Sequence, residues 1–203
     1  MTLTDVRRVF AAMGPAGPPA PEWIRPAVEG GRPAAVLVPL FEEDGDTRVV
    51  LTRRSSNLRS HTGEVAFPGG RLEPSEAPLA GALREASEEV GLDPAVCDVL
   101  GELTPLSTMS SSAAITPVVA ALPGRPHLRP NPHEVERIFD VALSELVGEG
   151  VFREERWPWP DGDRPVYFFE LEGDTVWGAT ARILHQLLDV VTGRVPFGHH
   201  QAT

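Results

Sequence analysis

The distribution of apolar residues along the chain predicts a series of short strands. Residues 34–41 (AAVLVPLF) form an almost continuous apolar run, which is typical of a buried strand. After a polar turn at 42–46, residues 47–52 (TRVVLT) are rich in β-branched side chains, and we expect them to return as a hairpin partner. The same criteria predict further strands at 64–67, 97–103, 113–122, 134–141 and 167–171.

Other segments carry apolar residues at helical spacing. Residues 1–14 predict a short amphipathic helix, and 142–147 predict another short one. The segment 180–191 places five apolar residues on one helical face: Ile183, Leu184, Leu187, Leu188 and Val191. Strands and helices alternate without a regular βαβ rhythm. We therefore expect an α/β fold in which a mixed β-sheet is sandwiched between helices, an α/β/α architecture.

The helix predicted to follow Ser75, with Pro78 in its first turn, carries the most informative pattern. Ser75 offers an N-cap, and Gly91 is a stop signal. The apolar stripe of this helix consists of Leu79, Leu83, Ala86 and Val90. At roughly 100° per residue, Glu85, Glu88 and Glu89 fall within an arc of about 100°, nearly opposite that stripe. We therefore expect the three glutamates to share a solvent-facing arc.

Three carboxylates this close repel one another in water by roughly a few tenths of a kcal/mol per pair. A hard divalent cation bound between them would reverse the sign of that interaction. The alternative is a solvated acidic helix face with no ligand. The preceding glycines, Gly69 and Gly70, are expected to form a turn, and they favour the cation because glycine lets the backbone approach another group closely. Glu76 and Arg84 supply an opposite-charge pair that would fix this loop against the helix.

The spacing of these residues resembles the Nudix box. Gly70 is followed after five residues by Glu76, and after seven more by Arg84-Glu85-Ala86-Ser87-Glu88-Glu89-Val90-Gly91-Leu92. The resemblance implies the α/β/α Nudix fold and metal-dependent hydrolysis of a diphosphate linkage, with Mg²⁺ or Mn²⁺ as cofactor.

By this resemblance, specific roles fall to the residues of the box. Glu85, Glu88 and Glu89 match the metal-binding carboxylates, with Gly70 beside them at the metal site. Arg84 and Glu76 match the pair that holds loop and helix in place. Glu85 is the first choice for the general base, while Glu134 and Glu136 are candidates for a base or further ligand from outside the box. An exposed strand start is the alternative explanation of that last pair.

A second pattern lies just upstream. Leu51-Thr52-Arg53-Arg54-Ser55 is followed at three-residue intervals by Arg59, Gly63 and Phe67-Pro68-Gly69-Gly70. This resembles the extra signature of the coenzyme A diphosphatase branch of the Nudix family, with Val50 as a mild departure where Leu or Phe is usual. Segments 115–119 and 177–184 are also similar to that branch.

Coenzyme A carries a 3′-phosphate beside its diphosphate, so a site for it needs additional cations. The candidates for substrate binding are Arg53, Arg54, Arg59 and His61. The leading prediction is therefore hydrolysis of coenzyme A or acyl-CoA to 3′,5′-ADP and a phosphopantetheine. Alternatives are a diphosphatase acting on ADP-ribose, NADH or another nucleoside diphosphate derivative, and a binding module that has lost catalysis.

Length and composition restrict the domain organisation and the kinds of partner that we expect. A chain of 203 residues suits one main domain at 34–193, preceded by an N-terminal helix and Pro-rich lead-in at 1–33 and followed by a flexible tail at 194–203. The net charge of −11 argues against nucleic acid as a partner. No apolar run reaches the length of a membrane span, and Cys97 is the only cysteine, so we expect a cytoplasmic protein. The resemblance to the Nudix family implies a small-molecule nucleotide as its partner. Composition leaves a homodimer open.

Overall fold

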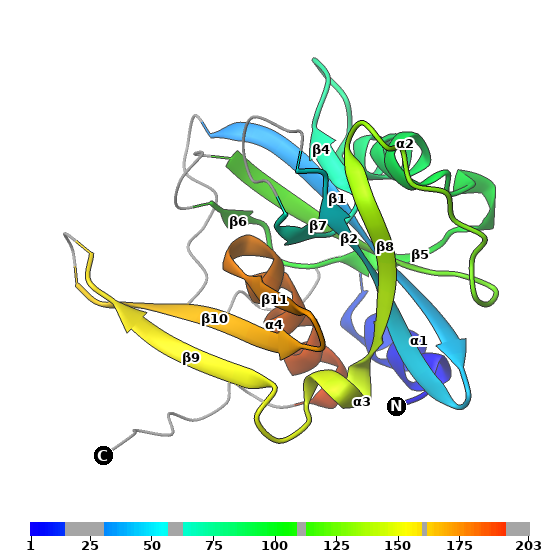
Figure 1. Ribbon diagram of the computed structural model, residues 1–203. Helices are drawn as coiled ribbons and strands as arrows, with labels where there is room; N and C mark the ends of the chain where they lie inside the picture. The colour runs from blue at the N-terminus through cyan, green and yellow to red at the C-terminus, as the bar shows by residue number, and fades with distance from the viewer. Residues whose placement is uncertain (15–30, 57–62, 109–112, 160–161, 194–203) are drawn as a thin grey trace.

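The computed structural model describes residues 1–14, 31–56, 63–108, 113–159 and 162–193 (Figure 1). In these residues the larger of two sheets has eight strands, in the order β3-β2-β1-β7-β5, with β4 paired to β1, β6 to β7 and β8 to β2. Its strands are β1 (Arg32–Glu43), β2 (Asp46–Arg54), β3 (Val65–Ala66), β4 (Gly69–Arg71), β5 (Asp98–Glu102), β6 (Leu106–Ser107), β7 (Ala113–Ala121) and β8 (Val135–Ala142). Strand β1 runs parallel to β7 and antiparallel to β2, so the sheet is mixed as expected.

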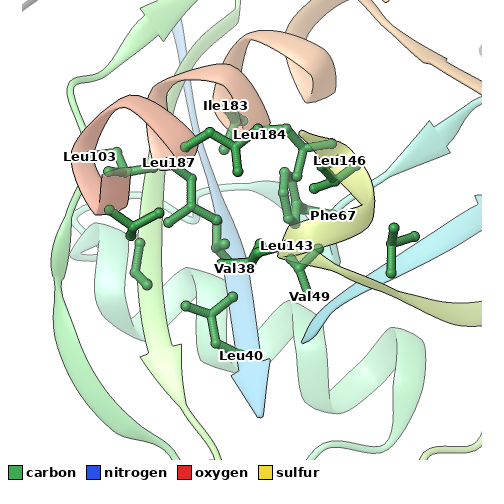
Figure 2. Packing of buried hydrophobic residues seen from close by; sticks show 14 of the residues in the cluster. Val38, Leu40, Val49, Phe67, Leu103, Leu143, Leu146, Ile183, Leu184 and Leu187 are labelled. Atoms are coloured by element: carbon green, nitrogen blue, oxygen red, sulfur yellow. The ribbon is translucent and has the colours of Figure 1, made fainter. Parts of the chain in front are cut away.

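Alternate residues of the central strands feed two separate cores. Leu37 and Phe41 of β1 point to one face, where they pack with Ala82 and Ala86 of helix α2 (Pro78–Val90). Val38 of β1 belongs to the core on the other face, together with residues of α1 (Leu3–Met13), α3 (Leu143–Leu146) and α4 (Gly178–Thr192). Figure 2 shows Ile183, Leu184 and Leu187 of α4 above Val38 and Leu40 of β1. Helices therefore cover both faces of the mixed sheet, and the α/β/α prediction is confirmed.

The N-terminal helix α1 belongs to this second core. Thr2 caps it, because the Thr2 side chain accepts the backbone N–H of Asp5 and the Asp5 side chain accepts from Thr2 in return. Leu3, Val6 and Phe10 are buried among residues of the sheet and α4. None of the helices in the described ranges is long and apolar enough to cross a membrane.

A second, three-stranded sheet lies beside α4. It consists of β9 (Phe152–Trp157), β10 (Arg164–Leu171) and β11 (Asp174–Trp177), in the order β11-β10-β9. Tyr167, Phe169 and Val176 of this sheet pack into the core that α4 covers. Sequence patterns predicted part of β10 but neither β9 nor β11, because β9 (FREERW) is dominated by charged residues and β11 is short.

The structure corrects two local predictions around α2. Ser75 is not the N-cap: it lies in a turn at a φ of 66°, and Ala77 is the N-cap with no side-chain cap hydrogen bond. The two glycines expected in a turn instead form β4, where Gly69 pairs with Val36 and Gly70 with Ala35. The stop signal is as expected, since Gly91 adopts the left-handed conformation that ends many helices.

The C-terminal end of α2 is hydrogen-bonded to the segment that precedes β8. The backbone N–H of Arg129 donates to the carbonyl of Val90 at 2.9 Å, and that of Asn131 donates to the carbonyl of Glu89 at 2.8 Å. The N–H of Val135, the first residue of β8, then donates to Asn131 at 2.8 Å. These bonds satisfy carbonyls that a helix end leaves without intrahelical partners, and they place Glu134 near α2.

Candidate functional site

The site is built where β4 meets α2. An added Cβ on Gly70 would lie 2.6 Å from the Cδ atom of Glu85 and 2.7 Å from each of its carboxylate oxygens. At Gly69, where φ is 157°, an added Cβ would lie 2.4 Å from the carbonyl oxygen of Ala35. Any larger residue at 70 would therefore fill the space that the Glu85 carboxylate occupies. Both glycines serve close approach, one to a neighbouring strand and the other to an acidic side chain.

Glu89 is buried, which corrects the expected solvent-facing arc. Only 4% of it is exposed, whereas Leu79, assigned to the apolar stripe, is 37% exposed. The Oε2 atom of Glu89 accepts the backbone N–H of Gly69 at 3.0 Å. Burial raises the pKa of Glu89 to about 7, although the Gly69 hydrogen bond and the Arg54 charge act in the opposite direction. The charges of Glu134 and Glu85 add to the rise.

Arg84 ties the helix to the loop before it, as the opposite-charge pair suggested. Its Nε atom donates to Oε1 of Glu76 at 2.9 Å and its Nη2 atom to Oε2 at 3.0 Å, which is a bidentate pair. The Arg84 hydrogen bonds lower the pKa of Glu76 to about 2. Arg84 also donates to Glu85 at 2.9 Å and approaches the exposed Glu88 at 3.3 Å. Arg84 thus contacts Glu76 of the loop and both Glu85 and Glu88 of the helix.

The carboxylate oxygens of α2 are the kind of donor that a divalent cation prefers, although the side chains are not gathered around one point. Across the described ranges no group of three or more His, Cys, Asp or Glu side chains is gathered closely enough to hold a metal ion. The fit rests on Glu85, whose carboxylate occupies the space left by Gly70, and on Glu89, a desolvated carboxylate. Oxygen donors of this kind suit Mg²⁺ or Mn²⁺. Glu85, Glu88 and Glu89, predicted as ligands from the sequence, are residues of α2 that could supply such donors.

A cavity of about 780 Å³ opens beside Gly69 and Gly70. The eight-stranded sheet contributes residues of β1, β2, β3, β4, β6 and β7, together with a few residues beside these strands. The three-stranded sheet, Trp159 and the first turns of α4 contribute the rest. Its volume lies within the range of roughly 300–1,000 Å³ that is usual for small-molecule sites. The acidic helix, the glycine strand and this cavity therefore form one continuous candidate site.

The predicted substrate-binding arginines behave differently from each other. Arg54 lines the cavity, and its Nη1 atom lies 3.9 Å from Oε1 of Glu89. Arg53 is not among the lining residues; it donates to Asp174 of β11 at 3.1 Å. The other two candidates, Arg59 and His61, lie outside the described residues.

The two candidates from outside the box also differ. Glu134 is partly buried and close enough to Glu89 to affect its pKa. Glu136 is exposed and lies 4.0 Å from Nε of Arg53. Of this pair, Glu134 is the one that the fold brings to the carboxylates of α2.

Several cavity residues were not singled out as site residues from the sequence. They come from the three-stranded sheet and the start of α4, and they include Trp157, Trp159, Tyr167, Trp177 and Arg182. A signal was available: three of the four tryptophans and the only tyrosine of the chain fall within residues 157–177. Two of these tryptophans, Trp157 and Trp177, are exposed in the structure, and exposed apolar surface of this kind can mark a binding site.

An α/β/α fold whose acidic helix faces a glycine strand and an open cavity defines the Nudix class of hydrolases. The family model described as the NUDIX domain matches residues 31–167, and the chain belongs to the Nudix family. Members of this family are hydrolases of small nucleoside diphosphate derivatives that generally use divalent metal ions such as Mg²⁺ or Mn²⁺.

The relatives agree with this assignment. The chain is 41% identical over 175 residues to the uncharacterized Nudix hydrolase NudL of Photorhabdus laumondii, covering 86% of this chain and 91% of that protein. It is 41% identical over 185 residues to the chloroplastic Nudix hydrolase 22 of Arabidopsis thaliana, covering 87% of this chain and 59% of the plant protein. A solved MutT/nudix family protein from Enterococcus faecalis shares the fold at 15% identity, with a TM-score of 0.55 over 96% of this chain and 76% of that one.

Proposed function

We propose that this chain hydrolyses the diphosphate bond of coenzyme A or an acyl-CoA, giving 3′,5′-ADP and (acyl-)4′-phosphopantetheine. The observation that carries the proposal is the cavity of about 780 Å³ joined to the Gly69–Gly70 strand, with Arg54 on its wall. A diphosphate held at the glycine end leaves room in the cavity for groups on either side of it. The upstream signature that includes Arg54 supports coenzyme A among the diphosphates that Nudix hydrolases cleave.

In the proposed reaction, water adds to one phosphorus of the diphosphate and the bridging P–O bond breaks. Glu85 would take the proton of that water; the close approach of its carboxylate to Gly70, which lines the cavity, supports this role. Glu134, near Glu89, is the alternative base or further ligand. A bound divalent ion supplies neutralisation of the phosphate oxygens and activation of the water.

Arg84 and Glu76 serve the reaction indirectly. Their bidentate pair holds the loop before α2 against the helix, and a further Arg84 hydrogen bond to Glu85 orients that carboxylate. Arg54 lies on the cavity side of Glu89 and supplies a guanidinium for a phosphate group of the substrate. The positive charge of Arg54 also offsets the negative charge of the Glu89 carboxylate when that group is ionised.

A substrate panel with Mg²⁺ tests the proposal. Coenzyme A, an acyl-CoA, ADP-ribose and NADH are compared by kcat/KM, with products separated by chromatography. Turnover of coenzyme A well above that of ADP-ribose and NADH is the expected result. Preference for ADP-ribose or NADH would assign the site to those substrates instead, and no turnover of any compound would identify a module without catalysis. Glu85→Gln is the matched variant, and it is expected to lose most of the turnover.

A further inference from the structure

Three tryptophan side chains line the cavity. Trp157 ends β9, Trp159 follows it, and Trp177 ends β11 immediately before α4. Trp157 is 38% exposed and Trp177 is 42% exposed, so these rings are not part of the core. Leaving large apolar rings accessible to water is unfavourable, and a cluster of them beside a phosphate-handling strand indicates a binding surface.

Two of these rings have side-chain partners that restrict their motion. The Nε1–H group of Trp157 donates to Oε2 of Glu155 at 2.7 Å. The guanidinium carbon of Arg164 lies 5.0 Å from the ring centroid of Trp159, over one face of that ring. A ring that is already fixed loses little conformational entropy when a flat ligand stacks on its open face. These supports therefore preorganise the surface.

Tyr167 of β10 is fixed in the same manner at the base of the cavity. Its ring stacks on the buried His185 of α4, with the ring centroids 4.5 Å apart and the planes only 6° from parallel. Burial raises the pKa of the Tyr167 hydroxyl further above its ordinary value, at which tyrosine is already neutral at physiological pH. The aromatic wall of the cavity, made of Trp157, Trp159, Tyr167 and Trp177, thus includes rings that are held by neighbouring side chains.

We propose that Trp157 and Trp159 form the subsite that stacks the adenine base of the nucleotide substrate and thereby determine its affinity. The proposal rests on the proposed function, because it assumes a diphosphate held at Gly69 and Gly70. Flat indole faces match a base, which gains about 1–3 kcal/mol per stacking contact. An acyl chain is the weaker match, because it requires complete removal from water, whereas the partly exposed rings here suit a base whose polar edge stays hydrated.

Calorimetric titration of the two reaction products onto the intact protein tests the subsite without turnover. The probes are 3′,5′-ADP, which contains the base, and 4′-phosphopantetheine, which does not. Trp157→Ala and Trp159→Ala are each expected to weaken 3′,5′-ADP binding by about 5- to 150-fold, the equivalent of about 1–3 kcal/mol, and to leave phosphopantetheine binding unchanged. Val99→Ala is the control, because Val99 is similarly exposed, at 39%, but lies on β5 away from the cavity.

A conservative variant separates stacking from support of the fold. Trp157→Phe keeps an aromatic face but lacks the Nε1–H group, so it is expected to retain most of the affinity that Trp157→Ala loses. Unchanged nucleotide binding in both alanine variants, or a loss confined to phosphopantetheine, would overturn the adenine subsite. If the wild type binds 3′,5′-ADP through these rings yet cleaves no coenzyme A, the proposed function fails and the subsite stands.

Discussion

Glu89→Gln is expected to make the metal-free protein more stable above pH 7 while abolishing its response to divalent cations. The reason is the burial of this carboxylate, which is only 4% exposed and has a pKa raised to about 7. Glutamine is nearly the same size and can still accept the hydrogen bond from the N–H of Gly69. The variant therefore mimics the protonated side chain at every pH.

The expected magnitude follows from the pKa shift. A rise from 4.5 to about 7 corresponds to about 3 kcal/mol of difference between the two protonation states. Because the folded-state pKa of Glu89 lies above its unfolded-state value, its favourable contribution is complete below pH 4.5 and is lost as pH rises through about 7. Wild type and variant should thus be equally stable at pH 4.5 and differ by about 3 kcal/mol at pH 8.

Urea unfolding at pH 4.5 and pH 8, with EDTA and with excess Mg²⁺, measures both effects. At one hundred times its dissociation constant, a cation bound only to the folded state stabilises the wild type by about 2.7 kcal/mol. The variant should show no such gain. Glu88→Gln is the matched control, because the Glu88 side chain is 60% exposed and its loss should leave metal-free stability unchanged.

Destabilisation of the metal-free Glu89→Gln protein at pH 8 would refute this reasoning. That result would mean that the ionised carboxylate stabilises the fold through Arg54, which lies 3.9 Å away. An undiminished Mg²⁺ response in the variant would separately defeat the assignment of Glu89 as a metal ligand.

Three further outcomes are expected. Gly70→Ala should reduce kcat by about 10- to 100-fold, since its Cβ would meet Glu85 at 2.6 Å at a cost of about 1–3 kcal/mol, whereas Gly124→Ala, with no atom within 4 Å, should leave steady-state rates unchanged. Arg54→Ala should lower kcat/KM for coenzyme A more than for its 3′-dephospho form; equal losses would show that Arg54 does not read the 3′-phosphate. Glu76→Gln should lower stability at neutral pH, with the difference from wild type shrinking below pH 4.5 and vanishing as pH falls through about 2; a pH-independent difference in urea unfolding would contradict the ion-pair explanation.

The regular elements were predictable where the sequence pattern was strong. The apolar run of β1, the apolar strand β7 and the stripe on α4 identified the central layers, because burial on the sheet and under helices requires continuous apolar faces. β9 could not be found this way. It lies in a small sheet with exposed charges along most of its length, so its pairing with β10 leaves no apolar periodicity.

The site was predictable in part for a similar reason. Fixed spacing identified the carboxylates of α2 and the Arg84–Glu76 pair, which the structure forms. The helical wheel nevertheless assigned Glu89 to solvent, because it considers apolar positions alone. Glu89 turns inward because the backbone N–H of Gly69 and the Arg54 charge lie there, and both come from strands distant in sequence. The three tryptophans of the cavity, Trp157, Trp159 and Trp177, were missed because only the tertiary structure brings them together.

The hydrogen bonds between the end of α2 and residues 129–135 constrain which changes of chain length this protein tolerates. Arg129 and Asn131 are bonded to the last turn of the helix, and Val135 begins β8 only four residues after Asn131. One inserted residue between Asn131 and Val135 would therefore shift Glu134 relative to the acidic helix. Insertions at 126–127 fall between the ion pairs of Arg125 with Glu43 and Asp140 and the first of these bonds, so we expect them to disturb the geometry around Glu89 less.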